Sequence, residues 1–169
     1  MNTYCYSGGF SIYALNEGAS LVHSVDSSQK AIDLVDNNVA LIPDLADKHE
    51  SFVSDSLEYI SATDTKYDVI ILDPPAFGKH KRVRHKAVQG YKRLNAKAMK
   101  KIQPGGIIFT FSCSQIVDKE LFANTIAAAA IEARRKVRVL HQLHQPADHP
   151  VNLAQPESEY LKGLVIQVL

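Results

Sequence analysis

Hydrophobic positions along the chain form short continuous runs, and between them lie longer segments with apolar residues three or four positions apart. Short runs are typical of buried strands, and the wider spacing is typical of amphipathic helices. The runs predict seven strands, over Asn2–Cys5, Leu21–Val25, Glu50–Val53, Tyr67–Leu72, Ile107–Phe111, Val137–Leu143 and Tyr160–Val168.

The segments between the strands predict helices, and the second is the clearest because Ser28 can cap it and Ile32, Val35 and Val39 recur on one face. The helices are expected over Gly9–Glu17, Ser28–Leu41, Leu57–Ala62, His85–Ile102 and Asp118–Arg135. Strands and helices alternate until the last two strands. The pattern therefore predicts an α/β protein with a doubly wound, mostly parallel sheet of seven strands and an antiparallel hairpin at its C-terminal edge.

In a doubly wound sheet, ligands bind at the carboxyl ends of the strands. The residues that directly follow the strands are therefore the candidate functional positions. They are Tyr6–Phe10, Asp26, Asp55, Asp73–Phe77 and Ser112–Ser114.

The composition narrows the class of protein. A length of 169 residues suits one domain, so we expect residues 1–169 to fold as a unit. No apolar run approaches the roughly 20 residues that span a bilayer. Two cysteines form no disulfide framework and fit a reducing cytoplasm, and none of the seven histidines has metal-ligand spacing. The sequence thus predicts a cytoplasmic location, with no membrane and no metal partner.

The net charge of +1 conceals a strong asymmetry, because ten of the nineteen basic residues and no acidic residue lie between Lys79 and Lys101. These ten are Lys79, Lys81, Arg82, Arg84, Lys86, Lys92, Arg93, Lys97, Lys100 and Lys101. A basic block on an otherwise acidic chain favours a polyanionic partner. A solvated helix face beside a mobile loop explains the block equally well.

The first candidate turn is Tyr6-Ser7-Gly8-Gly9-Phe10. Its two glycines permit close approach of a ligand to the backbone and leave N–H groups free at a helix start. The turn is not G-x-G-x-x-G, so the dinucleotide fingerprint is not met. A tight turn without a ligand remains an equal alternative.

Two acidic residues follow the next two strands. Asp26, eighteen residues beyond Gly8, can accept hydrogen bonds from both hydroxyls of a ribose. Asp55 can accept from an adenine amino group. Each has a simpler alternative as a helix cap, Asp26 before Ser27 and Asp55 before Ser56.

The strongest local signal is Asp73-Pro74-Pro75-Ala76-Phe77, after the most continuous apolar strand. Two prolines fix an extended backbone, which presents carbonyls and a carboxylate to a planar ligand. Phe77 can stack on a base. The alternative, a rigid loop with Phe77 in the core, is weaker because an aspartate and two prolines gain little from burial.

Together these segments resemble the class I S-adenosylmethionine methyltransferases, which have a Rossmann-like fold. Within that class they are most similar to the bacterial large-subunit (23S) ribosomal RNA cytosine-C5 methyltransferases. The similar stretches are Tyr4–Phe10, Ser24–Ser28, Asp73–Phe77, Gly90–Asn95, Phe109–Ser114, Ala147–Val151 and Tyr160–Gly163. The resemblance implies S-adenosyl-L-methionine as cofactor and large-subunit ribosomal RNA as partner, and it leaves a homodimer open.

The resemblance also implies two sets of contact residues. The expected cofactor contacts are Tyr6, Ser7, Gly8, Gly9, Phe10, Asp26, Ser27, Asp55, Ser56, Asp73 and Pro74. The expected substrate contacts are Pro75, Phe77, Lys81, Arg82, Arg84, Tyr91 and Lys92. Members of the family usually carry an N-terminal PUA-type RNA-binding domain and a further segment. Because this sequence starts inside the expected first strand, we expect a truncated catalytic core.

Cys113 is the expected nucleophile, and Asp73 is expected to orient the base. A thiolate that adds to carbon 6 of cytosine makes carbon 5 nucleophilic enough to take a methyl group. A lone cysteine is more often a small packing residue, but its place at a strand end favours chemistry for Cys113, whereas Cys5 favours packing. Many RNA cytosine-C5 methyltransferases have a second cysteine where Pro75 stands, so another base must release the product here.

Two other functions fit the same residues. A guanine or adenine nitrogen methyltransferase of the same fold would bind an amino group at Asp73–Phe77, and Cys113 would then be incidental. An RNA-binding fragment without catalysis would use the basic block alone.

Overall fold

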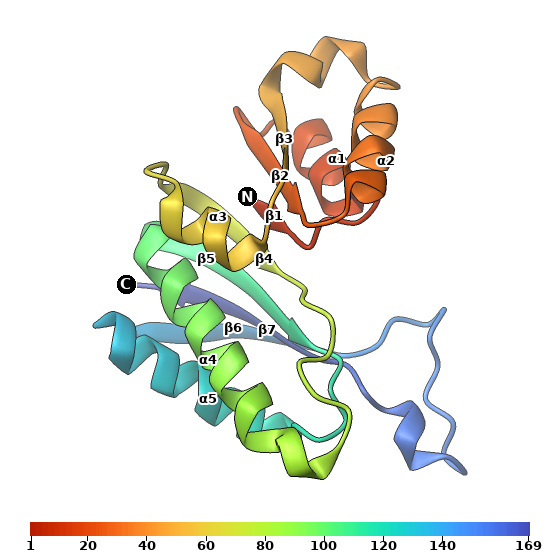
Figure 1. Cartoon of the computed structure of the whole chain (residues 1–169), viewed down its shortest axis with the longest axis vertical. Coiled ribbons are helices and arrows are strands. Elements are labelled where there is room, and N and C mark those ends of the chain that lie inside the picture. Colours follow the sequence, from red (N-terminus) through yellow and green to blue (C-terminus); the bar gives the residue numbers. More distant parts are fainter.

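The computed structural model describes all 169 residues and contains one seven-stranded sheet with the strand order β3-β2-β1-β4-β5-β7-β6 (Figure 1). The strands are β1 (Asn2–Thr3), β2 (Val22–Asp26), β3 (His49–Val53), β4 (Tyr67–Leu72), β5 (Ile102–Ser112), β6 (Val137–Leu143) and β7 (Lys162–Val168). Neighbours from β3 to β5 are parallel, and β7 is antiparallel to both β5 and β6. The predicted doubly wound sheet with an antiparallel edge hairpin is confirmed.

Helices cover both faces of the sheet. They are α1 (Gly9–Asn16), α2 (Gln29–Val39), α3 (Ser56–Ala62), α4 (Arg84–Lys101) and α5 (Lys119–Ala133), with short 3-10 helices η1 (Pro43–Lys48), η2 (Lys81–Val83) and η3 (Pro156–Ser158). On one face, Asn2 of β1 and Ser24 of β2 bond to Ser11 of α1. On the other face, Ile70 and Leu72 of β4 pack with α4 and α5. The helices form a layer on each face of the sheet because strands and helices alternate along the chain.

The larger of two hydrophobic clusters has 22 buried residues and lies between the sheet and the helices α3, α4 and α5. Tyr91 of α4 and Phe122 of α5 are its largest fully buried side chains. A second cluster of six residues lies under α1 and α2. Burial of each large apolar side chain contributes roughly 1.5–3 kcal/mol to the free energy of folding. Packing of α4 and α5 in this cluster therefore helps to fix the strands on which they lie.

The strand bounds differ from prediction by one or more residues in several strands, and two of these differences have a clear cause. Strand β1 ends at Thr3 because Tyr4 takes a left-handed conformation with φ of 54°. Strand β5 begins at Ile102 rather than Ile107, since Gly105, with φ of 84°, absorbs an irregularity in the pairing with β4. The apolar pattern is interrupted around Gly105, so it does not predict the first part of this strand.

The strand order reverses between β1 and β4, so the carboxyl ends of these strands open into one crevice. The long loop between β6 and β7, residues 144–161, projects away from the sheet (Figure 1). None of the helices is long and apolar enough to cross a membrane. No group of three or more His, Cys, Asp or Glu side chains is arranged to hold a metal ion.

Candidate active site at the carboxyl ends of the strands

The glycine turn after β1 is held tightly by the chain itself. Gly8, with φ of 80°, donates its N–H to the carbonyl of Cys5 at 2.7 Å, and the carbonyl of Ser7 accepts from Asn38 Nδ2 at 2.8 Å. A Cβ on Gly8 would meet Val35 at 3.1 Å, whereas one on Gly9 would meet nothing within 4 Å. The space above Gly9 is therefore open at the start of α1, where N–H groups have no partner inside the helix.

Two tyrosines near this turn have strained backbones. Tyr4 and Tyr6 take positive φ values of 54° and 47°, which bulky residues rarely adopt. Tyr6 is 70% exposed, and its N–H donates to Asp26 Oδ2 at 3.1 Å. Strain of this kind gathers at binding and catalytic sites and persists only where neighbours enforce it.

Asp26 at the end of β2 links the turn to the next helix. Its Oδ1 accepts the N–H of Ser28 at 2.9 Å, while its Oδ2 accepts from Tyr6. Asp55 after β3 caps α3, because its Oδ1 accepts the N–H groups of Leu57 at 2.8 Å and Glu58 at 3.0 Å. Asp55 thus has the capping role that the sequence offered as the simpler alternative, whereas α2 is capped by Ser28 and Asp26 holds the turn in front of that cap. Each carboxylate keeps lone pairs for a further donor.

Two of the predicted cofactor contacts have partners within the protein, so their contact with a cofactor stays a prediction. Ser56 is buried, and its hydroxyl accepts the N–H of Tyr4 at 3.3 Å, so it supports the strained turn rather than facing a ligand. The ring of Phe10 stacks on Phe111 of β5 with centroids 6.3 Å apart, so only its backbone belongs to the turn. Ser27 is exposed beside Asp26, as a ligand contact would be.

Asp73 at the end of β4 is the strand-end carboxylate that makes no hydrogen bond within the protein. Burial by surrounding protein raises its pKa, although its side chain remains open to solvent. Pro74 is buried and Pro75 is exposed, so the segment presents alternate sides to the core and to the crevice. A carboxylate that is partly desolvated and has no partner is a group available for a ligand.

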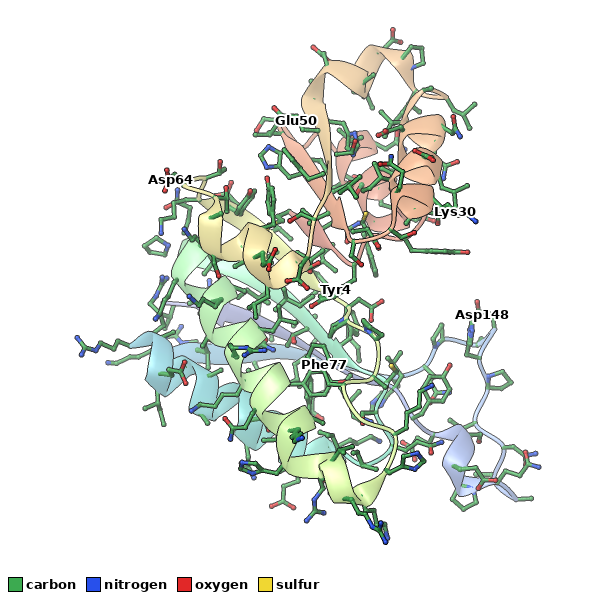
Figure 2. All side chains as sticks on the ribbon, viewed as in Figure 1. Tyr4, Lys30, Glu50, Asp64, Phe77 and Asp148 are labelled. Carbon is green, nitrogen blue, oxygen red and sulfur yellow. The ribbon has the colours of Figure 1, made fainter.

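Phe77 and Tyr91 pack against each other with ring centroids 4.6 Å apart (Phe77 is labelled in Figure 2). A Cβ on Gly90 would meet the Phe77 ring at 2.8 Å, so this glycine lets the ring lie on α4. Tyr91 is fully buried. Tyr91 therefore offers no exposed side-chain surface to a substrate, whereas Phe77 is partly exposed and its expected substrate contact stays a prediction.

The hydroxyl of Tyr91 nevertheless belongs to the site. It has no hydrogen-bond partner, and it faces Ser112 and the backbone of Phe77, with Asp73 and Cys113 close enough to act on it electrostatically. The hydroxyl lies beneath the crevice beside Ser112 and the Phe77 backbone, so Tyr91 supports this end of the site from below.

Cys113 follows β5 and is partly exposed, whereas Cys5 is buried. The turn that carries Cys113 is fixed on both sides: Ser114 Oγ donates to the carbonyl of Gly78 at 2.7 Å, and the Ser114 N–H donates to Ser112 Oγ at 3.3 Å. Burial, followed by the charge of Asp26, raises the pKa of Cys5 to about 12. Of the two thiols, only Cys113 is therefore placed for chemistry.

A cleft of about 490 Å³ adjoins these residues between α3 and α4, lined by Tyr4, Asp55, Leu57, Glu58, Phe77, Lys86, Gly90, Arg93 and Leu94. Figure 2 shows Tyr4 near the end of α3 and Phe77 beside α4. The cleft carries two basic side chains, Lys86 and Arg93, at its rim.

The basic block divides into two groups. Lys81, Arg82 and Arg84 are exposed on η2 and the start of α4, and Val83 beside them contacts Gly78 of the crevice. Lys92 instead forms an ion pair with Glu132 of α5 at 2.9 Å. The ammonium of Lys92 is thus engaged between two helices at the surface, and its expected substrate contact stays a prediction.

One residue of this site was missed in the sequence. Lys162 at the start of β7 is buried, and its amine donates to the carbonyls of Ser114 at 2.7 Å and Tyr160 at 2.6 Å. The Tyr160–Gly163 stretch was noted only for its resemblance. A lysine in a strand is usually on a solvated side, so only the structure shows this one turned inward.

Curated relatives match the whole chain. "Ribosomal RNA large subunit methyltransferase I" of Shewanella denitrificans is 41% identical over 172 residues, which cover 99% of this chain and 43% of the relative. The protein of the same name from Vibrio campbellii is 40% identical over 174 residues, covering 100% of this chain and 44% of the relative. The chain thus spans less than half the length of these relatives.

Solved structures establish the fold as the Rossmann-like methyltransferase fold. SMU.776, solved as a complex with SAH, superposes with a TM-score of 0.80 at 24% identity, over 98% of this chain and 44% of that chain. Trm5b from Pyrococcus abyssi superposes with a TM-score of 0.72 at 19% identity, over 99% of this chain and 43% of that one. Residues 1–130 match the family described as "Conserved hypothetical protein 95", and the chain belongs to that family.

Proposed function

We propose that the chain is the catalytic core of an S-adenosylmethionine-dependent methyltransferase that modifies carbon 5 of a cytosine in large-subunit ribosomal RNA. The observation that carries the proposal is the pairing of a partly exposed thiol at Cys113 with an unpartnered carboxylate at Asp73, across neighbouring strand ends. The names of the relatives support a methyltransferase acting on ribosomal RNA.

The residues of the crevice fit S-adenosylmethionine. Gly9 leaves open space over the N–H groups of α1, Asp26 keeps lone pairs for the ribose, and Asp55 keeps lone pairs for the adenine. Asp73 and the Pro74 backbone border the side where the methyl group would lie. When bound, the cofactor supplies an electrophilic methyl group. SMU.776 holds SAH on the same fold, which supports this assignment.

Different residues of the chain would then carry out the separate steps of the reaction. The thiolate of Cys113 adds to carbon 6 of the cytosine, and the electron pair moves to carbon 5, which accepts the methyl group. Asp73 orients the base through its amidine edge. A base takes the proton from carbon 5, and the returning electron pair expels the Cys113 sulfur. Pro75 stands where a second cysteine would otherwise take part in release.

The basic residues Lys81, Arg82 and Arg84 would contact phosphates around the crevice. Such contacts position a nucleic acid and do not select its sequence. Selection would then depend on the crevice itself and on any further part of the protein.

Product analysis tests this function directly. The protein is incubated with radiolabelled S-adenosylmethionine and unmodified large-subunit ribosomal RNA, and the RNA is digested to nucleosides. We expect label in 5-methylcytidine. Label only in N-methylated guanosine or adenosine would replace the proposal with a nitrogen methyltransferase, and RNA binding without any label would leave only an RNA-binding role. The same reaction is run in parallel with the relative from Shewanella denitrificans.

A further inference from the structure

Helix α4 carries a row of exposed cations along one of its faces. The members of this row, here called the α4 row, are Lys86, Arg93, Lys97 and Lys100. At about 3.6 residues per turn, positions that follow Lys86 by seven, eleven and fourteen residues fall on the same side of the helix. None of the four forms an ion pair, and α4 itself contains no acidic residue.

The α4 row is not needed to cap the helix. The carbonyl of Lys100 accepts from Lys66 Nζ at 2.6 Å, and the carbonyl of Met99 accepts from Arg135 at 3.0 Å. Cations at the last carbonyls of a helix stabilise it through those hydrogen bonds and through the helix dipole. The end of α4 thus receives its capping cations from other segments, and the side chains of Lys97 and Lys100 remain in solvent.

The α4 row also works against the stability of the helix. Arg93 and Lys97 are four residues apart, and Lys97 and Lys100 are three apart, so their side chains are neighbours on the helix surface. Like charges at these spacings destabilise a helix. Glu132 of α5 lies within electrostatic reach of both lysines, but its ion pair is with Lys92. A row that costs stability and keeps its charges free favours a role in binding a polyanion.

The α4 row leads from the site toward the opposite end of the sheet. Its first two members line the cleft of the site together with Asp55 and Glu58, so the uncompensated charge lies mainly at Lys97 and Lys100. The fourteen residues from Lys86 to Lys100 rise about 21 Å along the helix axis. At roughly 3.4 Å per nucleotide of a stacked strand, about six nucleotides span this length.

We propose that the α4 row binds the sugar–phosphate backbone of an RNA segment that lies outside the methylated nucleotide. The inference rests on the proposed function in that RNA is the substrate there. The row extends the contact surface beyond Lys81, Arg82 and Arg84, which lie near the crevice itself. A single row that begins at the site fits a strand that enters the crevice, whereas a lipid surface is bound by cations flanked by apolar anchors.

Salt-dependent RNA binding tests the proposal. Binding of the whole chain to a ribosomal RNA fragment of about 20 nucleotides, which is longer than the row, is followed by fluorescence anisotropy over a range of salt. Lys97→Gln combined with Lys100→Gln should reduce the slope of log affinity against log salt by about 1.4, at about 0.7 per phosphate contact. Arg at both positions should keep the wild-type slope. The charge-matched control, Lys30→Gln combined with Lys48→Gln, should keep it as well.

Acetylation by acetic anhydride locates the contact in the wild-type chain. Bound RNA should protect Lys97 and Lys100 from acetylation, as measured by peptide mass spectrometry, and should leave the exposed Lys30 unprotected. A wild-type salt slope in the Gln variant overturns the proposal, and so does equal acetylation of the two lysines with and without RNA.

Two further outcomes separate this inference from its alternatives. If the Gln variant loses binding to vesicles of anionic phospholipid while its RNA binding is unchanged, the proposal is overturned in favour of a membrane contact. The proposed function fails separately, when methyl label is absent from 5-methylcytidine although the salt slope of RNA binding still depends on Lys97 and Lys100.

Discussion

The two halves of the crevice differ in how their polar groups are satisfied. At the ends of β2 and β3, Asp26 and Asp55 accept two backbone N–H groups each. At the ends of β4 and β5, Asp73 and the Tyr91 hydroxyl have no hydrogen-bond partner, and Cys113 is partly exposed. The first half, here called the frame half, is ordered by hydrogen bonds within the chain. The second half, here called the reactive half, keeps its polar groups free for a ligand.

The largest effect is expected at Asp73. Replacing it by Asn should lower turnover by about 10²–10⁴-fold, the range for loss of a positioned acid or base. Because burial raises the pKa of Asp73, its ionised form is disfavoured in the fold, and the Asn variant should melt at the same or a higher temperature. Steady-state kinetics with thermal unfolding measures both. An Asn variant with normal turnover would place Asp73 among the structural residues.

A matched pair of substitutions separates cofactor binding from helix capping in the frame half. Asp26→Ala should weaken binding of S-adenosylhomocysteine by roughly 2–3 kcal/mol, the value of two charge-assisted hydrogen bonds, in isothermal titration. Asp55→Ala should cost about 1 kcal/mol of folding stability as a lost helix cap. Asp33→Ala on the exposed side of α2 is the control for both. Unchanged binding in the Asp26 variant would remove this residue from the cofactor site.

Acid should destabilise the frame half, because the buried His23 and the half-buried His49 lie there. His23 Nδ1 lies 2.8 Å from the Tyr59 hydroxyl, and His49 Nε2 lies 2.8 Å from Ser24 Oγ. Burial lowers the pKa of both histidines from 6.5, so the unfolded chain takes up protons first as the pH falls below that value. The free energy of unfolding should then fall by about 1.4 kcal/mol per pH unit for each histidine.

Urea unfolding between pH 7 and 5 measures this slope. The His49→Gln variant should lose about half of it, and His144→Gln, in the exposed loop after β6, should lose none. A slope unchanged by His49→Gln would mean that other groups govern acid stability.

The smallest effect is expected on RNA binding, and it should be confined to the reactive half. Replacing Lys81, Arg82 and Arg84 by Ala should reduce the slope of log affinity against log salt by up to about 2, at about 0.7 per phosphate contact. Replacing Lys30 and Lys48, on the frame half, should leave the slope unchanged (Lys30 is labelled on α2 in Figure 2). Equal slopes for both variants would mean that the crevice does not face the nucleic acid.

Sequence reasoning was strongest where one physical rule dominates. Strand and helix alternation predicted the sheet, and the strand-end rule predicted the positions of Asp26, Asp73 and Cys113. It could not predict the direction of side chains, since a helix pattern does not say that Tyr91 is buried or that Lys92 pairs with Glu132. Lys162 was missed for the same reason, because its inward position depends on carbonyls supplied by distant segments.

One measurement tests the covalent role of Cys113 directly. RNA with 5-fluorocytosine at the target blocks proton loss from carbon 5, so a cysteine adduct should survive denaturing electrophoresis. We expect the adduct with the wild-type protein and with Cys5→Ala, and none with Cys113→Ala, whose affinity for S-adenosylhomocysteine should be unchanged. A Cys113→Ala variant that methylates unmodified RNA at the wild-type rate would contradict the account and favour the nitrogen methyltransferase.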